Sequence, residues 1–122
     1  MPLKGSCHCR AIQFEIESPP GEVTACTCSF CSKRGALWAY YAPEQFRLTT
    51  SPRRVASYQW GAFMMEHFHC AICGCATHGV GPEWVDFQPH PTRRRINVNA
   101  RLLDDFDLAA APVRLIDGKN LW

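Results

Sequence analysis

Residues 70–75 read Cys70-Ala71-Ile72-Cys73-Gly74-Cys75, and this stretch determines the architecture together with two further cysteine clusters. The other clusters are Cys7-His8-Cys9 and Cys26-Thr27-Cys28-Ser29-Phe30-Cys31. Together the three hold all eight cysteines of a 122-residue chain. The sequence shows no secretory signal, so we expect a reducing, cytoplasmic location, where clustered cysteines bind metal more often than they form disulfides.

The spacing of the outer clusters predicts a closed metal site. In Cys-x-Cys on an extended strand, residues i and i+2 share a face, so both sulfurs can approach one ion. Tetrahedral zinc with Zn–S bonds near 2.3 Å places its sulfurs roughly 3.8 Å apart, which such a pair can reach. Cys-x-x-Cys followed by Gly74 resembles the tight knuckle of zinc ribbons. We therefore assign a structural zinc to four thiolates: Cys7, Cys9, Cys70 and Cys73.

The middle cluster provides Cys26, Cys28 and Cys31 within six residues. Three protein ligands with an open fourth position are typical of a catalytic zinc, so this cluster is the candidate second metal site and the candidate catalytic centre. Cys75 is left over. It either completes the middle site or is a small buried thiol, and the second interpretation is favoured.

Hydrophobic periodicity predicts a mainly β protein, a single compact domain of short antiparallel strands over residues 1–122. Period-two alternation at 11–17 is typical of a half-buried strand. Further short strands are expected at 37–41, 46–49 and 95–99, with a hairpin of 55–60 and 64–69 turning at Gly61. A helical turn at 29–34 should end at Gly35, and a short helical stretch is expected around 104–110. The segment 79–91 contains three prolines and is expected to be an irregular loop, either functional or a plain surface excursion.

Charge and hydropathy argue against a membrane span and make nucleic acid a weakly supported alternative partner. The apolar runs fall short of the ~20 residues that a membrane helix needs. Net charge is +2, and the arginine runs at 53–54 and 93–95 make a weak electrostatic footprint for nucleic acid. We expect the run at 93–95 to be a solvated strand edge.

The sequence resembles the glutathione-dependent formaldehyde-activating enzyme family, which also contains centromere protein V. The resemblance extends over nearly the whole chain. The motifs that carry it are Gly5-Ser6-Cys7-His8-Cys9, Cys26-Thr27-Cys28-Ser29-Phe30-Cys31-Ser32-Lys33-Arg34-Gly35, Phe68-His69-Cys70-Ala71-Ile72-Cys73-Gly74, Ile96-Asn97-Val98-Asn99-Ala100-Arg101-Leu102-Leu103-Asp104-Asp105 and Asp117-Gly118-Lys119-Asn120.

This resemblance implies a β-tent fold with two zinc ions. The ligands would be the same two sets, with Cys26, Cys28 and Cys31 at the catalytic ion. It implies carbon–sulfur lyase activity that interconverts glutathione plus formaldehyde with S-hydroxymethylglutathione. The alternative is a zinc-stabilised binding module without catalysis, since centromere protein V belongs to the same family.

Three residues near the middle cluster are candidates for substrate binding. Lys33 and Arg34 could receive the carboxylates of a thiol such as glutathione, since arginine binds carboxylates bidentately. The alternative for both is a solvated turn. Trp38 could wall the site, although an aromatic residue in a strand is more often part of the core. His67 and His69 are expected to lie at the surface or beside metal ligands.

Overall fold

The computed structural model describes residues 2–121, which form two β-sheets. A three-stranded antiparallel sheet has the order β1-β2-β5, with β1 at Leu3–Ser6, β2 at Gln13–Ile16 and β5 at Phe46–Leu48. A seven-stranded sheet has the order β10-β3-β4-β9-β8-β7-β6. Its strands are β3 Val23–Cys26, β4 Trp38–Tyr41, β6 Val55–Tyr58, β7 Glu66–Cys70, β8 Ala76–Val85, β9 Gln88–Asn99 and β10 Val113–Ile116. The prediction of a mainly β, antiparallel-rich domain is confirmed.

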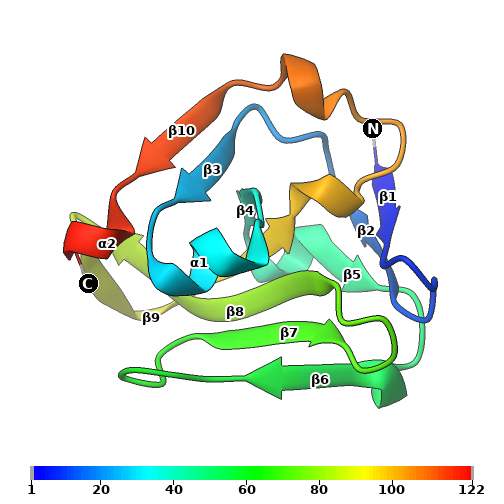
Figure 1. Ribbon diagram of the computed structural model, residues 1–122, viewed down its shortest axis with the longest axis horizontal. Coiled ribbons are helices and arrows are strands. Elements are labelled where there is room, and N and C mark those ends of the chain that lie inside the picture. The colour runs from blue at the N-terminus through cyan, green and yellow to red at the C-terminus, as the bar shows by residue number, and fades with distance from the viewer. Residues whose placement is uncertain (1, 122) are drawn as a thin grey trace.

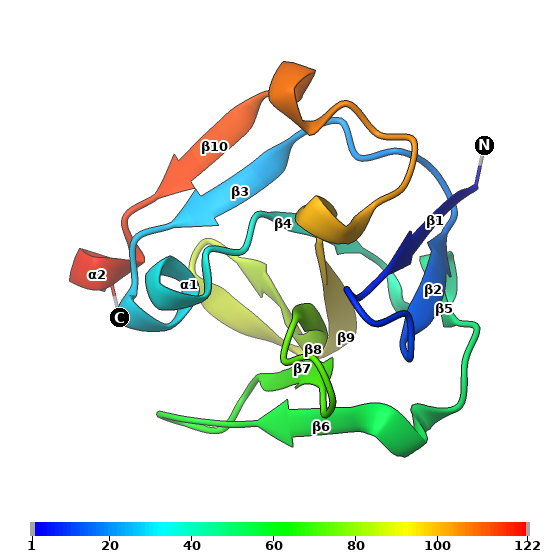
Figure 2. The ribbon, with the colours of Figure 1, turned by 45° about the vertical axis from the view of Figure 1, so that its right-hand side comes forward.

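The hydrophobic core lies where the two sheets meet. Alternate residues of β2 point inward, so that Phe14 and Ile16 are buried while Glu15 stays partly exposed. They pack in one cluster with residues of β4 and β9, among them Ala39 and Val98. Figures 1 and 2 show the small sheet standing beside one end of the large one, next to the N-terminus. The core therefore occupies one face of the large sheet.

His78 is a polar member of this packing. Its ring lies between Phe46 and Phe68, with centroid distances of 4.8 Å and 4.7 Å. Thr77 Oγ1 lies 3.0 Å from His78 Nδ1. Burial lowers the pKa of His78 from 6.5 to about 4, so the ring is neutral at pH 7.

The expectation of an irregular loop at 79–91 is wrong. Strands β8 and β9 pair through this segment and are 10 and 12 residues long. The glycines here serve close packing, because a Cβ on Gly79 would lie 2.6 Å from Asn97 Oδ1 and one on Gly81 would collide with Met65. The prolines are tolerated because β4 pairs only with the second half of β9, which leaves the first half an edge, and because β8 is irregular at 82–84.

The remaining expectations are mostly confirmed. The β6–β7 hairpin turns at Gly61, whose φ of +63° suits a residue without a Cβ. Helix α1, Ser29–Arg34, ends at Gly35 in the left-handed region. The helical stretch near 104–110 is only a 3-10 turn at Leu108–Ala110. The other short helices are 3-10 turns at Pro43–Gln45, Pro52–Arg54 and Ala100–Leu102, and α2 at Gly118–Leu121. No helix in residues 2–121 is long and apolar enough to cross a membrane.

Candidate metal centres

The first cysteine cluster consists of Cys7, Cys9, Cys70 and Cys73, the four residues that the sequence predicts to form a closed zinc site. Cys7 and Cys9 lie in the turn that follows β1, and Cys70 and Cys73 lie where β7 turns into β8. All four sulfurs lie within 4.8 Å of one another. The Sγ of Cys9 is 3.7 Å from that of Cys7 and 3.6 Å from that of Cys70. These separations match those of sulfurs around one tetrahedral ion, and the site joins the small sheet to the large one.

Backbone amides already point at these sulfurs. Ile12 N–H donates to Cys7 Sγ at 3.4 Å, and the amides of Ile72 and Cys73 donate to Cys70 Sγ at 3.3 Å and 3.4 Å. Gly74 closes the knuckle at a φ of +81°. Such donors stabilise negative charge on sulfur, which is the form that binds a metal.

The pKa values of two thiols in this cluster are shifted in opposite directions, that of Cys73 downward and that of Cys9 upward. Burial raises the pKa of Cys73, but the amides of Cys75 and Cys9 together with neighbouring thiols outweigh it and lower the pKa to about 5. The pKa of exposed Cys9 rises to about 11; the Ala11 amide lowers it, while desolvation and the thiols of Cys70, Cys7 and Cys73 raise it. Four sulfurs in contact resist ionising together, and a divalent cation would remove that conflict. The donor set fits a structural zinc.

The second cluster contains Cys26, Cys28 and Cys31, whose sulfurs also lie within 4.8 Å of one another. Cys26 ends β3, Cys28 caps α1, and Cys31 lies in the first turn of the helix. The Cys31 amide donates to Cys28 Sγ at 3.4 Å, and Trp38 Nε1 donates to Cys31 Sγ at 3.4 Å. Burial is the main reason why the pKa values of Cys26 and Cys31 are raised, and neighbouring thiols add to it. In residues 2–121 no fourth Cys, His, Asp or Glu side chain joins this group.

The C-terminal segment supports the second cluster through the parallel pairing of β10 with β3. Thr27 Oγ1 donates to Asp117 Oδ1 at 2.7 Å and accepts from the Lys119 amide at 3.2 Å. The Gly118 amide donates to the Cys26 thiol and lowers its pKa. Residues about 90 positions later in the chain thus hold Cys26 and Thr27, at the start of the second cluster, in place.

The predicted substrate-binding residues lie close to this cluster but in different settings. Lys33 is exposed on the last turn of α1. Arg34 is partly buried, and its guanidinium lies 4.7 Å from the centroid of the Phe30 ring. Trp38 is only 3% exposed and packs with Ala36 and Ala76. Its indole nitrogen donates a hydrogen bond to Cys31 Sγ.

An aromatic group surrounds Phe30, the α1 residue that precedes Cys31. The Phe30 ring lies 4.1 Å from the ring of His67 and 5.9 Å from the rings of Tyr58 and Trp60. Burial, together with the positive charge of Arg34, lowers the pKa of His67 to about 4. His67 is therefore a neutral ring against Phe30 at physiological pH.

Cys75 does not complete the second cluster. It packs beside Cys7, Ile12 and Cys70, and it is hydrogen-bonded to the His8 amide and to Cys73. It is therefore a half-buried thiol next to the first cluster. No disulfide joins any two cysteines within residues 2–121.

The sequence-based expectation of a solvated edge at 93–95 is wrong for Arg95, whose side chain is half-buried. The guanidinium lies 3.9 Å from the centroid of the Tyr40 ring, and Nε is buried without a hydrogen-bond partner. The next inward-pointing residue on the same face of β9 is Asn97, which is 5% exposed. A period-two pattern such as Arg95-Ile96-Asn97-Val98-Asn99 signals a polar face but does not say what that face meets.

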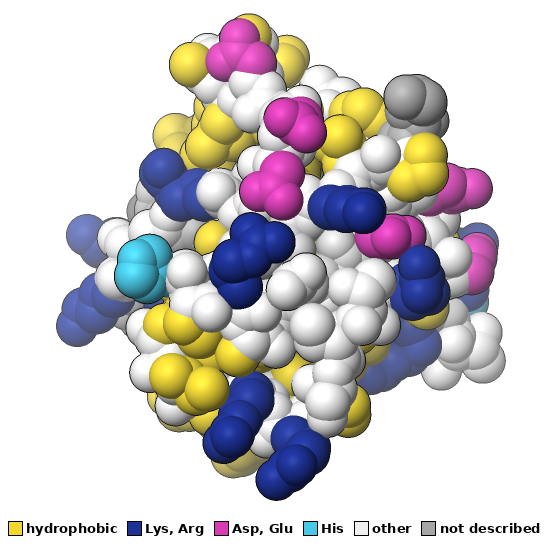
Figure 3. Space-filling model, turned by 90° about the vertical axis from the view of Figure 1, so that its right-hand side faces the viewer, with side chains coloured by type: hydrophobic (Ala, Val, Ile, Leu, Met, Phe, Trp, Pro, Cys, Tyr) yellow, Lys and Arg dark blue, Asp and Glu magenta, His cyan; other side chains and the backbone are white. Residues whose placement is uncertain are grey.

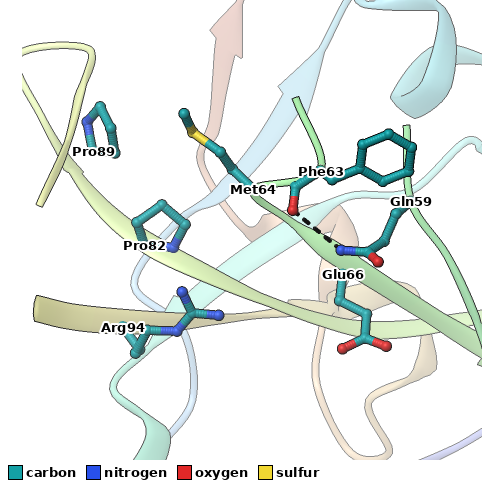
Figure 4. A pocket seen from close by; sticks show the side chains of 7 residues that line it. All are labelled: Gln59, Phe63, Met64, Glu66, Pro82, Pro89 and Arg94. Carbon is teal, nitrogen blue, oxygen red and sulfur yellow. Dashed lines mark hydrogen bonds between the residues drawn. The ribbon is translucent and has the colours of Figure 1, made fainter. Parts of the chain in front are cut away.

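A pocket of about 380 Å³ lies at the tip of the β6–β7 hairpin and contains no cysteine (Figure 4). It is lined by Gln59, Phe63, Met64, Glu66, Pro82, Pro89 and Arg94. Arg94 and Arg95 are consecutive on β9 and so point to opposite faces of the sheet. Trp38, which contacts Cys31, shares a face with Tyr40 and Arg95, so the cavity and the second cysteine cluster belong to different faces of the sheet.

Basic side chains do not form one continuous surface on the face shown in Figure 3. Lysines and arginines there are separated by uncharged groups and, in the upper half, by acidic ones. Two of the arginines are ion-paired: Arg47 with Glu15 at 2.9 Å and Arg93 with Glu83 at 3.0 Å.

Comparisons with known proteins agree with this geometry. Residues 2–113 match the family described as glutathione-dependent formaldehyde-activating enzyme. A crystal structure of a Rhodobacter sphaeroides protein is similar, with a TM-score of 0.72 and 29% identity over 91% of this chain and 99% of that one. A search of curated proteins gives no match. The extent of the family match, with both thiol clusters in place, shows that the chain belongs to the glutathione-dependent formaldehyde-activating enzyme family.

Proposed function

We propose that the protein is a zinc-dependent carbon–sulfur lyase acting on adducts of glutathione or a related thiol with formaldehyde. One observation carries this proposal: Cys26, Cys28 and Cys31 gather three sulfurs within 4.8 Å with no fourth protein ligand among residues 2–121. A three-thiolate set leaves one coordination position for a substrate, which is the arrangement of catalytic zinc sites. The family match supports glutathione as the thiol.

The side chains around the cluster suit a reaction of a thiol with an aldehyde. Zinc held by Cys26, Cys28 and Cys31 would supply a position at which a substrate thiol gives up its proton to solvent at neutral pH. In the adduct-forming direction, the substrate sulfur donates its electron pair to the formaldehyde carbon, the carbon–oxygen π bond opens, and the oxygen takes a proton from water. The reverse direction breaks the same carbon–sulfur bond. Trp38 holds Cys31 in place, and Arg34 and Lys33 supply positive charge for the carboxylates of the substrate.

The first cluster has a structural role in this proposal. Cys7, Cys9, Cys70 and Cys73 would fill all four positions of one zinc and so tie the turn after β1 to the β7–β8 turn. A closed set of four thiolates has no position for a substrate.

Metal counting with an activity assay tests the proposal. Two zinc equivalents per chain are expected, of which a mild chelator removes one. Exchange of magnetisation between glutathione and its hydroxymethyl adduct, followed by NMR, then reports turnover above the uncatalysed rate. Cys28→Ser should lose the accessible zinc and the turnover, whereas Cys75→Ser, beside the other cluster, should keep both. Two zinc ions without any turnover would favour the non-catalytic binding module.

A further inference from the structure

Five buried side-chain atoms in residues 2–121 have no hydrogen-bond partner, and they gather on one face of the molecule. They are Arg34 Nη1, His67 Nδ1, His69 Nδ1, Arg95 Nε and Asn97 Oδ1. Buried polar atoms are nearly always paired, so a concentration of unpaired ones needs an explanation. A ligand that reaches this face would provide the missing partners.

Strand register and side-chain alternation place four of these five atoms on one face of the large sheet, those of His67 and His69 on β7 and those of Arg95 and Asn97 on β9. Tyr40, Asn97, Gly79, His67 and Tyr58 lie opposite one another in sequence across β4, β9, β8, β7 and β6. They form one row on the face that does not pack against the small sheet. The row has no side chain at Gly79, where a Cβ would lie 2.6 Å from Asn97 Oδ1. Its middle is therefore a low, polar stretch.

A guanidinium lies above each half of this row. Arg34 stacks on Phe30 at 4.7 Å, and Phe30 in turn lies 4.1 Å from His67 on β7. Arg95 stacks on Tyr40 of β4 at 3.9 Å. Stacking leaves the edges of a guanidinium free to donate to a carboxylate.

The second cysteine cluster adjoins the elements that position both arginines. Cys31 lies three residues before Arg34 on α1, and its sulfur accepts a hydrogen bond from Trp38, which shares a face of β4 with Tyr40, the ring beneath Arg95. The Tyr40 ring beneath Arg95 belongs to β4, and the His67 ring that contacts Phe30 beneath Arg34 belongs to β7; these two strands are three positions apart in the sheet, roughly 14 Å at a strand spacing of about 4.8 Å. A tripeptide spans about 10–11 Å between its ends, and a γ-linked first residue lengthens it.

The acidic residue whose charge acts on Arg95 is ion-paired with a different arginine. The acidic group that acts on it is Glu83, which is paired with Arg93 at 3.0 Å. Arg114 on β10 adds a second positive charge nearby. This end of the row is therefore electropositive.

We propose that Arg34 and Arg95 bind the two terminal carboxylates of one dicarboxylate thiol substrate, whose central thiol reaches the Cys26, Cys28 and Cys31 cluster. The inference rests on the proposed function for the identity of the site and adds how the substrate lies across it. Asn97 Oδ1 accepts an amide N–H of the substrate. A peptide thiol of the γ-glutamylcysteinylglycine type has this layout, with a thiol midway between two carboxylates.

Calorimetric titration of the zinc-loaded protein tests this recognition without relying on turnover. The probes are glutathione, glutathione with its glycine carboxylate blocked as an ethyl ester, and 2-mercaptoethanol. Arg34→Gln and Arg95→Gln should each weaken glutathione binding by about tenfold, the lower end expected for a charge-assisted hydrogen bond at a partly exposed site. Esterification should weaken binding further in only one of the two variants. In the other variant, the arginine that binds the glycine carboxylate is already missing, so blocking that carboxylate costs no additional affinity.

Matched controls remove an arginine outside the row. Arg94→Gln, on the opposite face of β9, and Arg53→Gln, in an exposed turn, should bind glutathione like the original protein. Unchanged glutathione affinity in both Arg34→Gln and Arg95→Gln would overturn the proposal, as would an equal loss of 2-mercaptoethanol binding. If the affinity pattern holds without lyase turnover, the recognition stands and the lyase proposal fails. Turnover with unchanged affinities would mean the reverse, that the lyase proposal stands and the recognition by these arginines fails.

Discussion

Replacing Trp38 with phenylalanine removes one hydrogen-bond donor from the second cluster and leaves its three sulfurs in place. Trp38 Nε1 lies 3.4 Å from Cys31 Sγ, and the side chain is only 3% exposed, so water cannot replace the lost donor. A hydrogen bond to a charged acceptor contributes about 1.5–3 kcal/mol. The affinity of the second site for zinc should therefore fall roughly 10- to 100-fold, as for other groups that orient metal ligands.

Competition with a chromophoric zinc chelator measures this effect. The first cluster serves as an internal reference, because its four thiols belong to the turns after β1 and β7 and should release zinc as before. Trp84→Phe, a similar change in a half-buried residue of β8, is the matched control. The smaller ring at position 38 also opens a gap beside Ala36 and Ala76, at a cost below the ~3–5 kcal/mol of a full truncation to alanine.

Equal zinc affinity of the second site in Trp38→Phe and the original protein would show that the indole donor does not stabilise the thiolate. A parallel loss of zinc from both sites would also count against this explanation, because it would indicate general destabilisation and not the loss of one donor.

Three further predictions concern stability and metal retention. His78 titrates at about 4 when folded and at 6.5 as a free side chain, so the unfolded chain binds the proton first as pH falls. Stability should decline from about pH 6.5 towards 4 by at most ~3 kcal/mol for this group, and urea titrations of His78→Phe should show a flatter profile. Cys9 is exposed, so Cys9→Ser costs little packing; loss of one zinc and a lower melting temperature by circular dichroism would then report the metal itself. Asp117→Ala removes the 2.7 Å bond to Thr27 and loosens the support of Cys26, so a chelator should take the second zinc several-fold faster.

The sequence predicted which thiols lie close together more accurately than it predicted the strands between them. Cysteine spacing predicted both clusters because residues two or three apart must lie close together whatever the surrounding fold. The closing of the first cluster across 61 positions followed from counting thiols, and the structure brings those four sulfurs within 4.8 Å. Cys75 could not be placed in this way, since only the turn after β7 shows which cluster it neighbours.

The β8–β9 hairpin could not be predicted for a physical reason. Glycine and proline usually mark turns, yet Gly79 and Gly81 serve close packing against Asn97 and Met65. That packing depends on register with other strands, which local periodicity does not contain. The same limitation hid the setting of Arg95, because its neighbour Tyr40 comes from a distant part of the chain.

The proposed chemistry requires that the Cys26, Cys28 and Cys31 site take a substrate thiol as its fourth ligand. Cobalt(II) substitution with optical titration by glutathione detects this ligand, since each bound thiolate adds a sulfur-to-cobalt charge-transfer band. We predict a saturable rise in that band at one glutathione per chain, from seven coordinating thiolates to eight, and no rise in Cys28→Ser. An unchanged spectrum at saturating glutathione, or the same rise in Cys28→Ser, would contradict a substrate thiol at this site.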